Sequence, residues 1–209
     1  MFAAIFNTDG RPIDPRPIGA AGHDVEVLGS ARRVAFICTK VDPALSEIGS
    51  CGIQSLDGRY WIAGRIRLDA RDDLRARLSD RVGSSADGLT DAQLCLHAYA
   101  AWGDGFLDRL AGDFCFVLWD GPRDRLVCAR DQLGVRSLFH ANAGGAWFIG
   151  DSLDWIATSA PVGRDLDDAW VADFLSVGHC LEFERTVYRH IRRLAPAHVL
   201  TLSDSGADL

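Results

Sequence analysis

The chain has 209 residues, 48% of them hydrophobic and 24% charged, so it can bury the core of one large domain. Its 29 acidic and 22 basic side chains give a formal net charge of −7. This charge argues against a nucleic-acid or anionic-membrane partner, because both need a basic face. The sequence has no run of about 18 apolar residues, so it predicts no membrane-spanning helix.

The first third of the chain alternates short apolar runs with turn residues. Residues 2–6 predict a strand that ends at the Asn-Thr-Asp-Gly turn of residues 7–10. Further strands are expected at 25–28, 34–38 and 60–68. An amphipathic helix is expected over 72–78, because Leu74 and Leu78 are spaced four residues apart.

A capping box marks the start of the next helix. Thr90 is followed three residues later by Gln93, so each side chain can bond the other residue's backbone N–H. The helix is expected to bury four apolar side chains: Leu94, Cys95, Ala98 and Trp102.

The strongest strand signal lies in the middle of the chain. Residues 114–119 are apolar on both faces and predict a central strand, which returns through residues 126–129. A second hairpin is expected from 137–141 to 146–149, then a helix over 167–177 and a last strand at 199–202. Hairpin-linked strands with a few separate helices predict an α+β sandwich of antiparallel sheets.

Cysteine, lysine and asparagine usage limits the possible chemistry. The six cysteines and six histidines do not cluster at zinc spacing, so no metal site is predicted. Four cysteines lie in apolar runs, which predicts that they are small buried residues of a protein in a reducing compartment. No signal peptide is evident either, so we expect a cytoplasmic protein. Lys40 is the only lysine, and Asn7 and Asn142 are the only asparagines.

Two central segments carry a resemblance to a known family. Residues 112–120 (Gly-Asp-Phe-Cys-Phe-Val-Leu-Trp-Asp) and 129–139 (Ala-Arg-Asp-Gln-Leu-Gly-Val-Arg-Ser-Leu-Phe) resemble the signature hairpin of asparagine synthetase B-type proteins. The segments 90–103 and 186–198 are also similar. The resemblance covers nearly the whole chain and implies one domain, residues 1–209, of the class II glutamine amidotransferase type. It also implies the Ntn-type αββα fold, with two stacked antiparallel sheets between helices.

In that family the domain hydrolyses glutamine and passes ammonia to a synthetase domain. The resemblance implies an N-terminal cysteine as nucleophile and an Asn-Gly pair as oxyanion hole. Here the nucleophile position is Phe2, and its bulk makes removal of Met1 unexpected. The Asn-Gly position falls on Arg65-Ile66 in one alignment and on Ala63-Gly64 in the other. Neither pair contains Asn, so we expect no catalytic residue and no glutaminase activity.

Other residues of the family pattern are expected to have structural roles. Ser50-Cys51-Gly52-Ile53 imitates the family's Met-Cys-Gly-Ile start, but a loop or strand cysteine is the better interpretation. Asp91 matches a substrate-binding position of the family, where it would be vestigial. The favoured interpretation is that its negative charge stabilises a helix N-terminus by about 0.3–1 kcal/mol.

The charged residues of the second central segment are also read as structural. Arg130, Asp131 and Arg136 are expected to form structural ion pairs beside the hairpin.

The synthetase part of the family binds ATP through a Ser-Gly-Gly-x-Asp-Ser loop, which this sequence does not contain. Gly150-Asp151-Ser152 lacks the paired glycines. The chain is therefore expected to be the front piece of a longer enzyme, with ATP and magnesium bound by a separate synthetase domain. It needs no cofactor of its own.

The pattern is most similar to lasso peptide cyclases and β-lactam synthetases, which form amides with an amine supplied by the substrate. The first hypothesis is an inactive glutaminase-like domain of an ATP-dependent macrolactam-forming cyclase. Its expected partners are the synthetase domain, and possibly a precursor peptide, a leader peptidase and a second copy. The alternatives are a glutamine-hydrolysing asparagine synthetase and a free-standing, non-catalytic interaction module.

Overall fold

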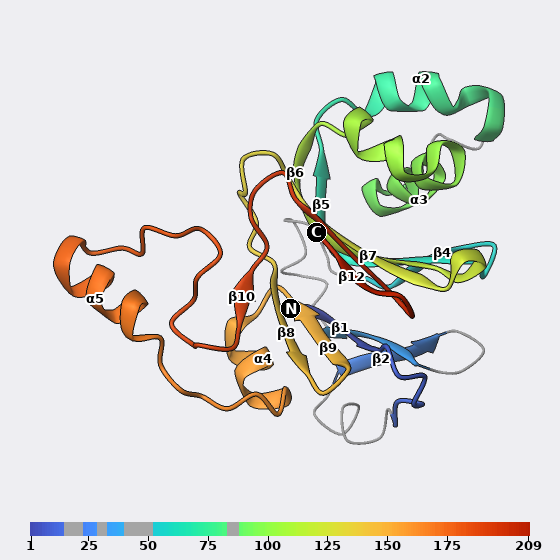
Figure 1. Ribbon diagram of the computed structural model, residues 1–209. Helices are drawn as coiled ribbons and strands as arrows, with labels where there is room; N and C mark the ends of the chain where they lie inside the picture. Colours follow the sequence, from blue (N-terminus) through green and yellow to red (C-terminus); the bar gives the residue numbers. More distant parts are fainter. Residues whose placement is uncertain (15–22, 29–32, 40–51, 83–87) are drawn as a thin grey trace.

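The structure, a computed structural model, describes residues 1–14, 23–28, 33–39, 52–82 and 88–209. Two six-stranded sheets form its centre (Figure 1). The first sheet has the order β10-β8-β9-β1-β3-β2 and the second has the order β12-β11-β7-β6-β5-β4. Every neighbouring pair of strands is antiparallel, as the sequence predicts.

The strands of the first sheet come from two separate parts of the chain, residues 2–39 and residues 139–193. They are β1 (Phe2–Asn7), β2 (His23–Leu28), β3 (Val34–Thr39), β8 (Phe139–Ala143), β9 (Ala146–Gly150) and β10 (Arg192–Arg193). The second sheet comprises β4 (Gln54–Leu56), β5 (Tyr60–Leu68), β6 (Gly112–Asp120), β7 (Arg125–Arg130), β11 (Val199–Ser203) and β12 (Gly206–Asp208).

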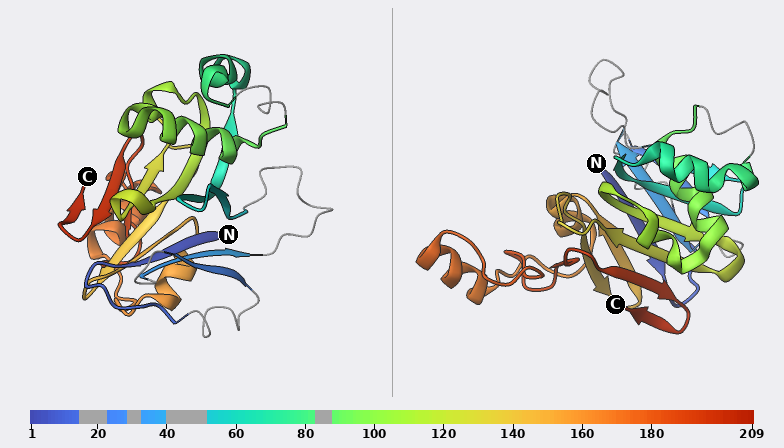
Figure 2. Two further views of the ribbon diagram at one scale, coloured as in Figure 1. Left: turned by 90° about the vertical axis from the view of Figure 1, so that its right-hand side faces the viewer. Right: turned by 90° about the horizontal axis from the view of Figure 1, so that it is seen from above.

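Helices cover the outer face of each sheet (Figure 2). Against the second sheet lie α2 (Arg71–Val82) and α3 (Asp91–Trp102), followed by the 3₁₀ helix η3 (Gly103–Arg109). Against the first sheet lies α4 (Leu153–Ser159). The short η4 (Gly121–Arg123) joins β6 to β7, and α5 (Asp168–Val177) projects away from both sheets.

Three apolar clusters follow from these layers. One lies between the sheets and includes Phe2, Phe36 and Trp119, all at most 2% exposed. A second packs β5, β6 and β7 against α2 and α3, and a third packs the first sheet against α4. From residue 114 to residue 120, every residue of β6 is buried, which confirms the predicted central strand.

Several local predictions are confirmed and some need correction. The capping box at Thr90 and Gln93 is formed. Trp102, expected to be buried by α3, is only partly buried because it lies at the last turn. The predicted helix at 167–177 exists with Asp167 as its N-cap, yet none of the α5 residues is buried.

The cysteines are mostly buried, as expected. Cys95, Cys115 and Cys128 are buried free thiols and Cys180 is half-buried. Cys38 is buried too, but it is disulfide-bonded, so the expectation of reduced cysteines throughout is wrong at this residue. Within the described part of the chain, no helix has both the length and the apolar character needed to cross a membrane. The cytoplasmic location stays a prediction.

Candidate functional site

Phe2 occupies the first position of β1 and is fully buried between the two sheets. Its backbone is opposite Cys38 of β3 in the antiparallel register. A phenyl ring has no nucleophilic atom. The first hydroxyl in the chain, on Thr8, lies beyond the end of β1 and donates to the carbonyl of Gly145 instead. The N-terminal end of β1 is therefore a packing position.

A single carboxylate joins Phe2 to the other sheet. Asp151, directly after β9, accepts a 2.8 Å hydrogen bond from the Phe2 N–H through Oδ1. Its Oδ2 accepts a 2.6 Å hydrogen bond from Nε of Arg65 in β5. The Asp151 side chain is 9% exposed and that of Arg65 is 32% exposed. This ion pair connects the first sheet to the second at the position where the family resemblance expects a catalytic nucleophile.

Neither alignment supplies a neutral amide donor for an oxyanion. Ala63 is fully buried in the inter-sheet core, where it presents only a methyl group. Arg65 carries N–H donors, but Asp151 neutralises its charge. Gly64 lies so close to β6 that an added Cβ would be 2.4 Å from the Cβ of Phe116. A glycine is therefore required at position 64 by strand packing alone.

A cavity of about 260 Å³ opens on the other side of β5. Its lining includes Gly64 and Ile66 of β5, Arg71 at the start of α2, and Thr90 and Asp91 at the start of α3. Arg65 is absent from that lining and contacts Asp151 instead. The cavity and the ion pair therefore lie to different sides of the same strand.

The carboxylate of Asp91 is already bound by groups of the protein. Its Oδ1 pairs with Arg71, and its Oδ2 accepts a 3.0 Å hydrogen bond from the Leu68 N–H. The same guanidinium donates to the carbonyl of Leu89 at 2.7 Å. Asp91 therefore connects the start of α3 to the end of β5 and to α2. Its vestigial substrate-binding role stays a prediction.

No described cysteine near Arg65 can replace the missing nucleophile. Cys115 pairs with Arg65 in the β5–β6 register and is fully buried. Burial, and to a lesser degree the charge of Asp151, raise the pKa of the Cys115 thiol to about 12. The thiol thus stays protonated at neutral pH, and a protonated thiol is a poor nucleophile. Cys51 and Ser50 lie outside the described residues.

The charged residues of the 130–136 turn bind backbone groups. Arg130 donates to the carbonyls of Gly134, Arg136 and Leu194, each at 2.6 Å. The carboxylate of Asp131 accepts from the N–H groups of Leu133, Val135 and Arg136. Arg130 and Asp131 therefore have the predicted structural role, but they hold the turn through hydrogen bonds to backbone groups and not through the expected ion pairs. Arg136 takes part with its backbone N–H and carbonyl.

Sequence analysis missed two members of this site. In the sequence, Asp151 belongs only to an incomplete ATP-loop pattern, yet in the structure it accepts hydrogen bonds from Phe2 and Arg65. The neighbouring Ser152 caps α4 by accepting from the Trp155 N–H. Arg71 was missed as the partner of Asp91. No local pattern marks either contact, because each joins residues at least 20 positions apart. Among the described residues, no group of three metal-ligating side chains is assembled.

A family model described as "Glutamine amidotransferase domain" matches residues 29–209. Asparagine synthetase [glutamine-hydrolyzing] 3 of Bacillus subtilis is 29% identical over 141 residues, which covers 68% of this chain and 22% of the relative. The chain thus spans less than a quarter of that relative's length.

Two solved structures share the fold of the whole chain. A glutamine aminotransferase class-II domain protein from Silicibacter pomeroyi has a TM-score of 0.54 and 13% identity, with coverage of 99% of this chain and 96% of the other. Glutamine phosphoribosylpyrophosphate amidotransferase from B. subtilis has a TM-score of 0.51 and 15% identity, with coverage of 99% and 42%. These neighbours place the sandwich in the Ntn glutamine amidotransferase fold.

Proposed function

The chain belongs to the glutamine amidotransferase domain family, and we propose that it is a glutaminase-like domain that does not hydrolyse glutamine. The observation that carries the proposal is that Phe2 occupies the nucleophile position. The Asp151 carboxylate accepts a hydrogen bond from the Phe2 N–H and another from the Arg65 side chain. Loss of one oxyanion donor lowers a rate by about 10²–10³, and loss of the nucleophile lowers it further.

We propose that the domain serves a larger ATP-dependent amide ligase of the asparagine-synthetase type. Its relative in B. subtilis is an asparagine synthetase of which the match covers only 22%. ATP and magnesium would be bound by the synthetase part, since the present sequence contains no Ser-Gly-Gly-x-Asp-Ser motif. The role of the present domain would be to support that part and to contact its substrate.

For the parent enzyme we propose macrolactam formation, as in lasso peptide cyclases. A cyclase takes its amine from the peptide substrate, so it has no need of ammonia from glutamine. The inert Phe2–Asp151–Arg65 arrangement suits such a ligase. A precursor peptide and a leader peptidase would then be its partners.

An asparagine synthetase is the second candidate, favoured by the name of the B. subtilis relative. A free-standing interaction module is the third.

Glutamine hydrolysis tests the first part of the proposal. The purified chain is incubated with glutamine and glutamate is followed over time. We expect no release above the background, whereas turnover in the common enzyme range of about 1–10³ per second would refute the proposal.

The double variant Phe2→Cys/Ala63→Asn would restore both chemical groups. We expect it to remain at least about 100-fold below that range, because Arg65 and Asp151 still occupy the site.

Product analysis tests the nature of the parent enzyme. The full-length protein is supplied with ATP and either a linear precursor peptide or aspartate with ammonia. A peptide product lighter by one water supports the cyclase, and asparagine supports the second candidate. Neither product, together with the absence of ATP consumption, would favour an interaction module.

A further inference from the structure

Exposed large apolar side chains are concentrated in two segments of the described chain. Nine such side chains are strongly exposed, and eight lie either in the 131–136 turn or in residues 163–189, here called the arm. In the arm, five of them define what we call the arm face: Phe174, Leu175, Val177, Leu181 and Phe183. Leu175 is 80% exposed and Phe183 is 73% exposed. The arm extends from the body of the molecule in Figure 1 and in the right-hand view of Figure 2.

The base of the arm is held by backbone pairing. The N–H of Asp167 donates to the carbonyl of Val187 at 2.9 Å, and that of Arg189 donates to the carbonyl of Asp165 at 2.9 Å. Thr186 is buried and donates from Oγ1 to the carbonyl of Ile191 at 2.7 Å. The two ends of the arm therefore form a short antiparallel stem.

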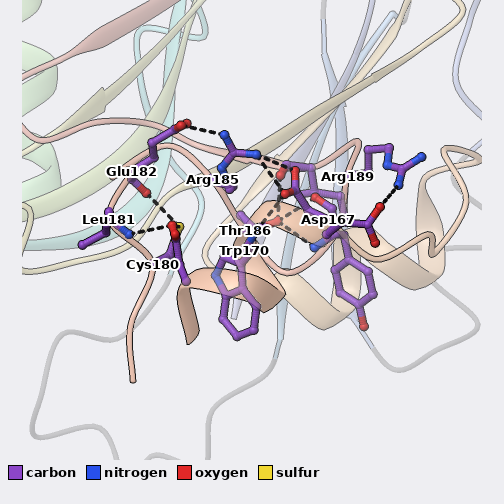
Figure 3. Close-up of polar contacts among 12 residues, drawn as sticks. Asp167, Trp170, Cys180, Leu181, Glu182, Arg185, Thr186 and Arg189 are labelled. Atoms are coloured by element: carbon purple, nitrogen blue, oxygen red, sulfur yellow. Dashed lines mark hydrogen bonds and ion pairs between the residues drawn. The ribbon is translucent and has the colours of Figure 1, made fainter. Parts of the chain in front are cut away.

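Polar side chains fix the shape of the arm beyond the stem (Figure 3). Asp167 accepts from the Trp170 N–H at 3.0 Å and caps α5, and it pairs with Arg185 at 2.8 Å. Arg185 also pairs with Glu182 at 2.6 Å. At the far end, Asp173 accepts a 3.2 Å hydrogen bond from the Leu181 N–H. The arm is thus built around its own polar groups.

The arm face therefore combines a defined shape with apolar side chains left in water. The polar groups of the arm are largely hydrogen-bonded within the arm, whereas the exposed Leu and Phe side chains of the arm face would be stabilised by burial against a partner. An apolar patch of this kind on an ordered element is typical of a protein–protein contact. A preorganised surface also binds at a lower entropic cost.

Charge distinguishes among the possible occupants of the arm face. The arm, residues 163–189, contains six acidic side chains and three arginines, so its net charge is negative. Two arms from two copies would bring like charges together, which disfavours an arm-to-arm dimer. A partner surface with an apolar centre and a basic rim is complementary. The B. subtilis relative, of which the match covers 22%, has room for a further domain with such a surface.

From these observations we infer that the arm face docks onto the synthetase-type domain of the parent ligase, through an apolar, basic-rimmed surface of that domain. The inference rests on the proposed function, because it takes its partner from it. The arm would then connect the two domains, and it would already have its folded shape before they bind each other.

Hydrogen–deuterium exchange of residues 168–183 tests the inference. The 209-residue chain is compared with the full-length protein made from the complete reading frame. We expect exchange to be at least about 10-fold slower in the full-length protein, because docking shields the arm. In that protein, Leu175→Gln and Phe183→Gln should return exchange to the rate of the isolated chain. Ala100→Gln, at an exposed position of α3, is the matched control and should leave it slow.

Three outcomes would overturn the inference. The first is equal exchange in the two proteins. The second is a reading frame that adds no folded domain to the 209 residues. The third is a dimer of the isolated chain that already protects the arm and that Leu175→Gln dissociates, which would assign the arm face to a second copy. Glutamine hydrolysis by the same samples would refute the proposed function separately, without altering the exchange result.

Discussion

Removal of the Asp151 carboxylate should loosen the contact between the two sheets. In Asp151→Ala, the Phe2 N–H loses its 2.8 Å acceptor and Arg65 loses its 2.6 Å partner. The N–H belongs to a fully buried residue, so water cannot easily replace the lost acceptor.

The expected cost follows from the exposure of each group. A buried donor left without an acceptor costs about 1–3 kcal/mol. The Arg65 side chain is 32% exposed and can be rehydrated in part, so its lost ion pair adds about 1 kcal/mol or less. Together these give a fall of about 1–4 kcal/mol in the free energy of unfolding.

Urea denaturation followed by tryptophan fluorescence measures this change. Asp151→Asn keeps an oxygen for the Phe2 N–H and should lose less than Asp151→Ala. The control is Asp154→Ala, which removes an exposed carboxylate from the first turn of α4 and should cost less than about 1 kcal/mol. A loss in Asp151→Ala no greater than that of Asp154→Ala would show that the carboxylate does not join the sheets.

Three further substitutions or conditions have defined outcomes. Gly64→Ala should lower the free energy of unfolding by about 1–3 kcal/mol in the same urea assay, because the added Cβ would overlap Phe116. Gly52→Ala is the control: its added Cβ meets open space, so the free energy of unfolding should change by less than about 0.5 kcal/mol. Thr90→Ala removes the side-chain cap of α3 and should cost about 1 kcal/mol, read as a lower melting temperature; an unchanged value would contradict the capping argument. Burial lowers the pKa of His140 from its ordinary 6.5 to about 4. Between these values the unfolded chain binds more protons, so the free energy of unfolding falls as the pH is lowered, by up to about 1.4 kcal/mol per pH unit, and His140→Gln should remove that part of the pH dependence.

Features that depend on neighbouring residues follow from the sequence alone. The capping box at Thr90, the buried strand β6 and the N-cap of α5 follow from spacing within a few positions. The absence of a nucleophile at Phe2 is also visible in the sequence, as is the absence of Asn from positions 63–66. These conclusions need only residue identity and local periodicity.

Contacts between distant residues depend on the tertiary structure. Asp151 and Phe2 are separated by 149 positions, and Asp151 and Arg65 by 86, so only the stacking and register of the sheets bring them together. The apolar pattern of α5 predicts a helix equally well for a buried and an exposed element. Its exposure is set by the stem formed between residues 165–167 and 187–189, which carries the helix away from the core.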